Sequence, residues 1–419
     1  MPAEPARSDV VRRTTCRVCG HDAFEPILSL GPSPLANAFL RSEEEFSSEP
    51  FFPLDLYFCR ECSLLQLLDV VNPEVMFRHY LYVTGTSTTM AEHNTAFAKL
   101  MAGRLELRPA DLIIDIASND GSLLRCFRDL GMATLGVEPA RNLAMQASDA
   151  GIETVNDFLS PALAEAIRAK RQPARLVSAN NVLAHVDDPA SFLTACRTLV
   201  GDDGLITIEV PWVRELLDRL EYDTVYHEHL SYFSATSLLH LCARVGLAAV
   251  RIERVPVHGG SLRIYLSRSA PRHSPEALAF QSAEADAGVT DTARYRRFAE
   301  DVRSHREKLR ALIERLRADG SEIVGYGAPA KGNTLLNYCG ITTATLPYTV
   351  DKNPLKVGLL TPGTHIPVKP VSALLDAPRR PDYVLILAWN FADEIMQQLR
   401  SYRERGGRFI VPIPEPQVV

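Results

Sequence analysis

Hydrophobic and polar residues follow one regular pattern through the middle of this chain. Short apolar runs alternate with segments whose apolar residues recur every three or four positions, which predicts buried strands and the helices that pack on them. The expected strands are Leu112–Ile116, Ala133–Val137, Leu176–Ala179, Leu205–Glu209 and Ala248–Arg254, and the expected helices include Ser122–Asp129 and Pro189–Leu199. Such alternation predicts an α/β fold with a mostly parallel sheet.

The same alternation returns near the carboxyl terminus. A long amphipathic helix is expected first, from Thr290 to Ala318, with its other face heavily charged. The strands expected after it are Glu322–Tyr326, Leu346–Val350, Tyr383–Ala388 and Arg408–Pro412. We therefore expect a helical connector followed by a second α/β unit.

The first 80 residues lack this pattern, and their informative residues are cysteines. Residues 1–15 are expected to form a flexible tail. Cys16 and Cys19 form one Cys-x-x-Cys pair, and Cys59 and Cys62 form another after 39 intervening residues. Two such pairs can complete a tetrahedral thiolate shell for structural zinc, with no open position for chemistry. A thioredoxin-like dithiol is the alternative, but neither pair follows a strand and opens a helix.

Composition narrows the functional classes. The chain has 419 residues, of which 46% are hydrophobic and 23% are charged, as in globular proteins of two or three domains. Its net charge of −6 argues against nucleic acid as the main partner. We see no apolar run of about 18 residues and no apolar leader, so we expect neither a membrane span nor a secretory signal. The four remaining cysteines are scattered, which suits the reducing cytoplasm.

A polar turn after the first central strand predicts a nucleotide-type cofactor site. The strand ends in Asp115-Ile116-Ala117-Ser118-Asn119-Asp120-Gly121, and Glu138 follows Asp115 by 23 residues at the end of the next strand. An acid at that distance is typical of a ribose contact, and NAD enzymes share it. A turn with a single glycine favours S-adenosylmethionine, which has no pyrophosphate to seat. Asp157 is either an adenine contact or an ordinary surface residue.

Titratable groups cluster between Tyr222 and Phe233, after the strand that ends at Glu209. Tyr226, His227, Glu228 and His229 are consecutive, and His185 follows the preceding strand. A metal site there lacks the i, i+4 spacing of a helical zinc pair and a third ligand. Two histidines above one sheet edge are better candidates for proton transfer.

At this point the chain resembles the sugar C-methyltransferases that act on nucleotide-linked, chiefly dTDP-linked, 4-keto-6-deoxyhexoses. The resemblance covers nearly the whole chain and rests on Cys16-x-x-Cys19-Gly20, Cys59-x-x-Cys62-Ser63-Leu64-Leu65-Gln66-Leu67, Tyr80-x-Tyr82-x-Thr84-Gly85-Thr86-Ser87, Ser118-Asn119-Asp120-Gly121-Ser122-Leu123-Leu124, Gly136-Val137-Glu138-Pro139-Ala140, Tyr226-His227-Glu228-His229, His258-Gly259-Gly260-Ser261-Leu262-Arg263 and Gly325-Tyr326-Gly327-Ala328-Pro329-Ala330-Lys331-Gly332. One departure is Ala117, where similar proteins have glycine.

The resemblance implies a class I methyltransferase core with a Rossmann-like fold, a small zinc-binding domain before it and a second Rossmann-like domain after it. We expect a zinc-binding domain over 16–80, the methyltransferase domain over 81–275, a helical connector over 276–318 and a substrate-binding domain over 319–419. The metal ligands are then Cys16, Cys19, Cys59 and Cys62. The cofactor residues are Asp115, Ala117, Ser118, Asn119, Asp120, Gly121, Glu138, Asp157 and Asn180.

The implied reaction is transfer of a methyl group, through an enolate, to a carbon next to the C4 ketone; C3 is favoured, and C5 stays open. By the resemblance, Tyr80, His185, Tyr226, Glu228 and His229 supply the catalytic groups, and we assign His229 as the base. Substrate contacts are expected from Tyr82, Gly325, Tyr326, Gly327 and Lys331, and His227 is assigned either to packing or to the substrate. Asp351 resembles the acid that binds a ribose in dinucleotide sites. A second dinucleotide site in the last domain is therefore an alternative interpretation.

Two other functions stay open from the residues alone. One is a catalytically silent zinc-ribbon and methyltransferase-like binding protein, and the other is an NAD-dependent keto-sugar oxidoreductase. For the C-methyltransferase reading, the expected cofactors are S-adenosylmethionine and structural zinc. The expected partner is a dTDP-sugar, without nucleic acid or membrane, and the protein is expected to be a cytoplasmic monomer.

Overall fold

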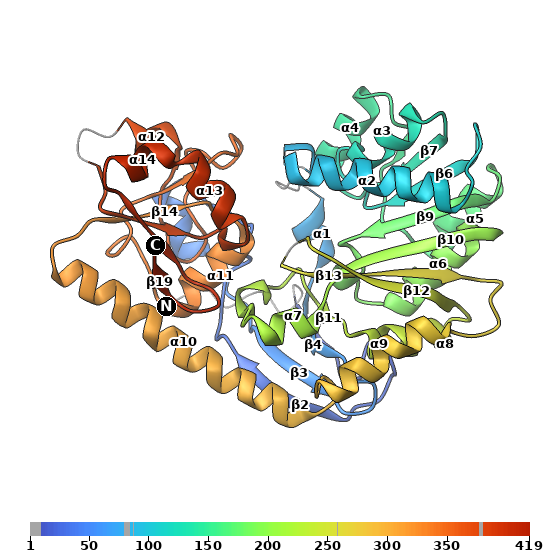
Figure 1. Cartoon of the computed structure of the whole chain (residues 1–419), viewed down its shortest axis with the longest axis horizontal. Coiled ribbons are helices and arrows are strands. Elements are labelled where there is room, and N and C mark those ends of the chain that lie inside the picture. Colours follow the sequence, from blue (N-terminus) through green and yellow to red (C-terminus); the bar gives the residue numbers. More distant parts are fainter. Residues whose placement is uncertain (1–9, 79–83, 87, 258, 377–379) are drawn as a thin grey trace.

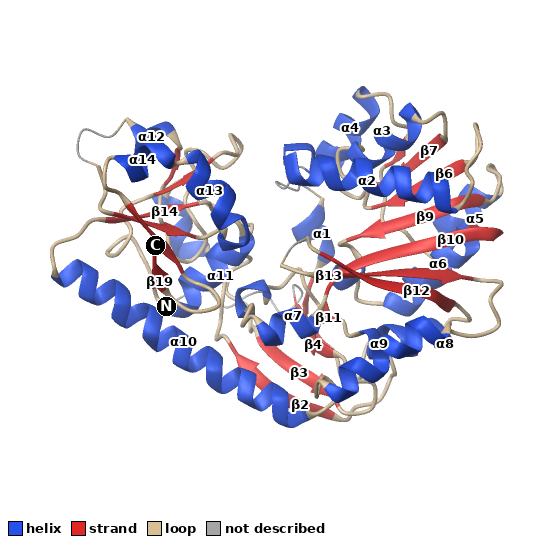
Figure 2. Ribbon diagram, in the orientation of Figure 1, coloured by secondary structure: helices blue, strands red, loops and turns tan. Residues whose placement is uncertain are grey.

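The computed structural model describes residues 10–78, 84–86, 88–257, 259–376 and 380–419. Two α/β units lie on opposite sides of the molecule, and strands of the N-terminal region lie beneath and between them (Figure 1). Each α/β unit has a sheet with helices packed on it (Figure 2). The α/β core with a mostly parallel sheet that the sequence predicts is confirmed.

The N-terminal region forms an antiparallel sheet of four strands. Its order is β11 (Ser231–Tyr232), β4 (Leu65–Leu67), β3 (Asp55–Cys59) and β2 (Phe24–Ser29). A further pair joins β1 (Val10–Arg12) to β5 (Asp69–Val71), and η1 (Glu43–Ser48) and α1 (Pro73–Phe77) complete the region. Because β11 comes from the middle of the chain, the N-terminal sheet is built into the central unit.

The central sheet has seven strands. In order these are β12 (Ala248–Val255), β13 (Ser261–Ser267), β10 (Val200–Pro211), β9 (Ala174–Asn180), β6 (Leu112–Ile116), β7 (Ala133–Val137) and β8 (Thr154–Val155). Only β13 runs antiparallel to its neighbours. The helical segments of this unit are η2 (Thr84–Thr86), α2 (Thr88–Arg104), α3 (Ser122–Asp129), α4 (Arg141–Asp149), α5 (Pro161–Arg168), η3 (Leu183–His185), α6 (Pro189–Leu199), α7 (Val213–Asp218), η4 (Tyr222–Thr224) and α8 (Ala235–Arg244).

The C-terminal sheet has six strands and is parallel except for its last strand. In order these are β16 (Val368–Pro370), β15 (Thr349–Asp351), β14 (Ile323–Tyr326), β17 (Tyr383–Ile386), β18 (Arg408–Val411) and β19 (Gln417–Val418). Helix α9 (Pro275–Asp286) packs on β12 and α8 of the central unit. The helical segments of the C-terminal unit are α10 (Thr292–Ala318), α11 (Ala330–Cys339), α12 (Ser372–Leu375), η5 (Trp389–Phe391), α13 (Ala392–Gln398) and α14 (Arg400–Glu404). The long helix α10 runs along the outside of this unit and reaches β2 (Figure 1).

Two sequence expectations need correction. The strand expected at Leu346 begins three residues later, at Thr349, because Pro347 has no N–H to donate to a ladder. Strand β13 was not predicted, because a charged residue, Arg263, lies in its middle. The structure buries Arg263 and pairs it with Glu209 of β10, which offsets part of the cost of a charge inside a sheet.

Within the described residues, none of the helices combines the length and the apolar character needed to cross a bilayer.

Candidate active site between the three parts of the chain

A cavity of about 570 Å³ lies where the three parts of the chain meet. Its wall takes residues from the carboxyl ends of β6, β7, β9 and β10, from the loop around Tyr226, and from both outer units. Asn37 comes from the N-terminal region, and Lys331, Lys356 and Asn390 come from the C-terminal unit. The volume is typical of a small-molecule site, and the end of a parallel sheet is where such folds bind their ligands.

The predicted cofactor turn follows β6 and is held by a carboxylate of the next strand. Ala117, Asn119 and Gly121 have φ values of 54°, 53° and 74°, so the backbone winds tightly at the cavity wall. Glu138, after β7, accepts hydrogen bonds from the Asn119 and Ala140 amides, both at 2.8 Å. Burial raises the pKa of Glu138, and these two amides oppose the shift. The carboxylate therefore fixes the turn and still has lone pairs for ribose hydroxyls.

The polar groups on this wall fit S-adenosylmethionine. Ser118 Oγ, Asn180 Oδ1 and Asn181 Oδ1 are buried and have no hydrogen-bond partner among the described residues. A buried polar atom without a hydrogen bond lowers the stability of the fold unless a ligand or water supplies that bond. Asp115 accepts a 2.6 Å hydrogen bond from the Ser178 hydroxyl. Burial raises the pKa of Asp115 to about 7, although the hydrogen bond from Ser178 lowers it.

Two of the expected cofactor residues lie off the cavity wall, and a third, Asp157, lies on it. Asp120 and Gly121 are not part of the cavity wall, because Asp120 accepts from the Ser122 hydroxyl at 2.6 Å and pairs with Arg125. Gly121 is the left-handed residue before α3. Asp157 does line the cavity, but its side chain is more than half exposed and lies 3.7 Å from Arg78.

Replacing Ala117 by glycine is expected to stabilise the protein. A left-handed φ of 54° costs an L-residue about 1–2 kcal/mol, whereas glycine pays about 0.5–1 kcal/mol in chain entropy. We expect Ala117→Gly to raise the free energy of unfolding by up to about 1 kcal/mol in a denaturant titration. Ala150, with φ −80°, is the matched control, and Ala150→Gly should lower it. A destabilised Ala117→Gly variant would contradict this account.

Tyr226 and His229 form a hydrogen-bonded pair on the cavity wall. The loop that carries them turns between η4 and β11. His229 Nδ1 lies 2.9 Å from the Thr224 carbonyl oxygen, which can only accept, so Nδ1 carries the ring proton. His229 Nε2 lies 2.9 Å from the Tyr226 hydroxyl and must then be the acceptor. This nitrogen is thus a base that already faces a proton donor in the cavity.

His185 stands beside this pair at the end of η3. Its ring centroid is 4.9 Å from that of His229, in an edge-on arrangement. Burial lowers the pKa of His185 to about 4, so the ring is neutral at pH 7. A neutral neighbour does not repel the charge that His229 gains when it takes a proton.

Glu228 and His227 point elsewhere. Glu228 accepts a 2.6 Å hydrogen bond from the Asn37 amide, so it joins the N-terminal region to this loop. His227 is not part of the cavity wall; its Nε2 donates to the Phe52 and Pro53 carbonyls at 3.3 and 3.2 Å. Burial lowers its pKa to about 4. This position favours the packing role of His227 over a substrate contact. Tyr80 and Tyr82 lie outside the described residues.

The glycine motif of the C-terminal unit does not form the expected phosphate-binding turn. The amides of Gly325 and Gly327 donate to the Tyr348 and Val350 carbonyls, so neither is available to a phosphate. Tyr326 is buried in β14 and is not part of the cavity wall. Lys331 alone among the four expected residues reaches the cavity.

Sequence reasoning missed a group of charged or polar wall residues. Glu209 ends β10 and is fully buried, with Arg263 at 2.8 Å and His93 of α2 at 3.2 Å. Burial alone would raise its pKa, but the hydrogen bond with His93 and the charge of Arg263 bring it below the usual value. Asn37 and Lys356 are further wall residues that the sequence did not predict. Glu209 could have been predicted, because it is an acid near the carboxyl end of an expected strand. Asn37 and Lys356 lie in loops, where the sequence has no periodic pattern that marks a site residue.

The four predicted metal ligands converge at the edge of the N-terminal sheet. The sulfur atoms of Cys16, Cys19, Cys59 and Cys62 all lie within 4.8 Å of one another, and the Cys16–Cys62 and Cys19–Cys59 pairs are 3.5 Å apart. A zinc tetrahedron with bonds of about 2.3 Å has edges of about 3.8 Å, so the four thiolates fit the ion. The Gln66 amide donates to Cys16 Sγ at 3.2 Å, which is a typical contact behind a ligand.

Comparisons with known proteins cover the same three parts. Three family models match the chain: "Putative zinc binding domain" over 16–77, "Methyltransferase domain" over 90–252 and "C-methyltransferase C-terminal domain" over 256–414. The C-methyltransferase NovU of Streptomyces niveus is 39% identical over 415 residues, which is 98% of each chain.

More distant similarities concern only part of the chain. A ubiquinone biosynthesis O-methyltransferase of Burkholderia thailandensis is 24% identical over 176 residues, 38% of this chain and 74% of its own. Among solved structures, the magnesium protoporphyrin IX methyltransferase of Synechocystis PCC 6803 with bound S-adenosylmethionine aligns with a TM-score of 0.32 and 12% identity. That alignment covers 43% of this chain and 79% of the other.

Proposed function

Because the chain belongs to the family of S-adenosylmethionine-dependent C-methyltransferases, we propose that its acceptor is a dTDP-linked 4-keto-6-deoxyhexose. The methyl group is added to the carbon next to the C4 ketone, at C3 rather than C5. The observation that carries this proposal is the Tyr226–His229 pair, which lies on the wall of the same cavity as the cofactor turn.

The reaction requires a base because a ketone's neighbouring carbon is not nucleophilic until it loses a proton. In the proposal, His229 Nε2 takes that proton, and the Tyr226 hydroxyl turns from the ring to the developing enolate oxygen. His229 Nδ1–H stays on the Thr224 carbonyl, which holds the imidazolium in place. Bound S-adenosylmethionine supplies an electrophilic methyl group. The enolate carbon would accept that methyl group with release of the neutral thioether, and His229 returns its proton to solvent.

His185 and Lys331 complete the proposed site. His185 stays neutral beside His229 and can hydrogen-bond the enolate oxygen or a neighbouring hydroxyl. Lys331 and Lys356 lie on the C-terminal wall, where two ammonium groups can face the two phosphates of a nucleotide sugar. Of these, Lys356 is already bonded to the Ala328 carbonyl at 2.7 Å, so Lys331 is the main phosphate partner.

Labelled methyl donor tests the proposed acceptor. The protein is incubated with S-adenosylmethionine carrying a ¹³C methyl group and with a dTDP-4-keto-6-deoxyhexose, and the position of the label is determined by NMR. A new carbon–carbon bond at C3 is expected. Methylation at C5 or at an oxygen would overturn the assigned position, and NADH oxidation without methylation would indicate a reductase. No reaction with any keto-sugar would favour a silent binding protein.

Glu138 is proposed to hold the cofactor ribose. Glu138→Ala is expected to weaken S-adenosylmethionine binding by about 1.5–3 kcal/mol in calorimetry, the range for hydrogen bonds to a charged group. Asp351 gives a matched control, because it ends β15 and accepts from the Ala328 and Asn353 amides at 2.7 and 2.8 Å, much as Glu138 accepts from its own turn. Asp351→Ala should leave cofactor affinity unchanged. Equal losses of cofactor affinity in both variants would mean that removing a turn-holding carboxylate, and not removing a ribose contact, weakens binding.

A further inference from the structure

The chain has two tryptophans, and each donates its indole N–H to a buried carboxylate at 2.6 Å. Trp212 bonds Glu284, close to the start of α8. Trp389 bonds Asp223 and so joins the C-terminal unit to the segment that leads into the Tyr226–His229 pair. The two bonds have the same chemistry, but only the second crosses between units near the proposed base.

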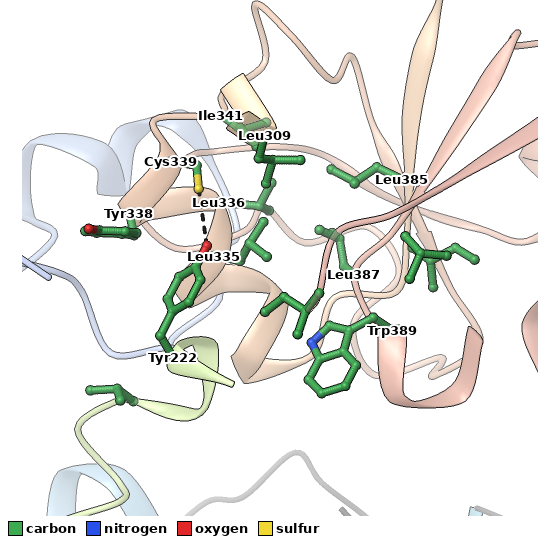
Figure 3. Close-up of a cluster of buried hydrophobic side chains, with 14 of the residues drawn as sticks. Tyr222, Leu309, Leu335, Leu336, Tyr338, Cys339, Ile341, Leu385, Leu387 and Trp389 are labelled. Carbon is green, nitrogen blue, oxygen red and sulfur yellow. Dashed lines mark hydrogen bonds between the residues drawn. The ribbon is translucent and has the colours of Figure 1, made fainter. Parts of the chain in front are cut away.

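The short helix η4, which contains Asp223, is held mainly by the C-terminal unit. The Tyr222 side chain reaches from η4 into that unit's apolar cluster, beside Leu335 and Leu336 of α11 (Figure 3). Its hydroxyl lies 3.5 Å from Cys339 Sγ and 3.1 Å from His305 Nδ1 of α10. Although η4 belongs to the central unit by sequence, its position is therefore set from the other side of the cavity.

The next residue after Asp223 controls the proton of the base. The Thr224 carbonyl accepts from His229 Nδ1 at 2.9 Å, and the Thr224 hydroxyl donates to the Glu221 carbonyl at 2.7 Å. A shift of η4 would move the Thr224 carbonyl away from His229. Without the hydrogen bond to this carbonyl, the ring proton is no longer fixed on Nδ1. His229 Nε2 is an acceptor only while Nδ1 carries the proton.

The bond between Trp389 and Asp223 also adjoins the cavity. Lys331 lines the cavity, and its ammonium lies 4.9 Å from the centre of the Trp389 ring. Asp223 Oδ1 and Lys331 Nζ are buried and have no hydrogen-bond partner within the described parts of the chain. The contact thus joins the proposed phosphate side of the cavity to the proposed base.

We propose that Asp223 and Trp389 are positioning residues of the methyl transfer: their hydrogen bond holds η4, and with it the Thr224 carbonyl, so that His229 presents Nε2 to the substrate. This inference rests on the proposed function of the Tyr226–His229 pair. It makes proton abstraction in the central unit depend on a residue of the C-terminal unit.

The test compares Trp389→Phe with Trp212→Phe in the full-length protein. Each variant loses one indole N–H from a buried carboxylate, so the two should lose similar thermal stability. Trp389→Phe is expected to lower kcat by about 10- to 100-fold, the effect of a small misplacement of a reacting group, with the KM for S-adenosylmethionine within about twofold. Solvent deuterium exchange next to the ketone, measured without methyl donor, should slow by the same factor. Trp212→Phe should keep both rates.

Asp223 variants separate positioning from folding. Asp223→Asn keeps an oxygen for the indole N–H and should stay within about threefold of wild-type kcat, whereas Asp223→Ala should match Trp389→Phe. Equal kcat and exchange rates in Trp389→Phe and Trp212→Phe would overturn the inference, as would an Asp223→Asn variant as slow as Asp223→Ala. If the wild-type protein neither exchanges nor methylates the keto-sugar, the proposed function fails, and this inference fails with it.

Discussion

His229→Asn is expected to bind cofactor and substrate almost normally and to lose about 10²–10⁴-fold in turnover, the usual worth of a positioned general base. The asparagine has a similar size and retains hydrogen bonding, but it has no nitrogen that can take a proton. Solvent deuterium exchange at the methylated carbon, measured without methyl donor, should stop as well. Loss of exchange separates failure of proton abstraction from failure of methyl transfer.

His227→Asn is the matched control, because it changes the same residue type two positions away. His227 is buried against the Phe52 and Pro53 carbonyls, outside the cavity wall, so its replacement should lower thermal stability and leave exchange near the wild-type rate. If exchange persists in His229→Asn but stops in Tyr226→Phe or His185→Asn, one of those residues is the base. Exchange that survives all three changes would mean that the histidine cluster is structural.

Zinc removal is expected to unfold the N-terminal region and to abolish activity in the same step. The two cysteine turns hold the ends of the N-terminal sheet, and structural zinc supplies about 10–16 kcal/mol of apparent binding free energy in small zinc domains at pH 7. The effect should reach the active site, because the Leu67 amide of β4 donates to the Leu230 carbonyl next to His229. We expect about one zinc per chain by mass spectrometry, and loss of folded protein in Cys59→Ser or Cys62→Ser.

Cys242→Ser provides the comparison for the zinc variants. Cys242 is a buried thiol of α8 outside the four-cysteine cluster, so its change to serine should cost only about 1–3 kcal/mol, the penalty for a buried hydroxyl. Its zinc content should not change. A metal-free preparation that remains folded and fully active would contradict the structural role of the ion.

Much of the local structure was determined by the sequence alone. The strands Leu112–Ile116 and Ala133–Val137 and the helices Ser122–Asp129 and Pro189–Leu199 have the predicted bounds, because buried parallel strands and amphipathic helices have strong periodic patterns. The four cysteines were predictable for a similar reason, since two Cys-x-x-Cys turns have one common chemical use. The predicted zinc and S-adenosylmethionine are confirmed at the level of family and fold.

Only the tertiary structure decided which neighbours in sequence become neighbours in the cavity. His227 and His229 are two residues apart, yet one packs on Phe52 and the other faces Tyr226, because a turning loop has no fixed alternation of side chains. Lys356 and Asn37 reach the same wall from opposite ends of the chain, and nothing in their local sequence marks them. Their position on this wall arises from packing between distant parts of the chain and not from any local periodic pattern.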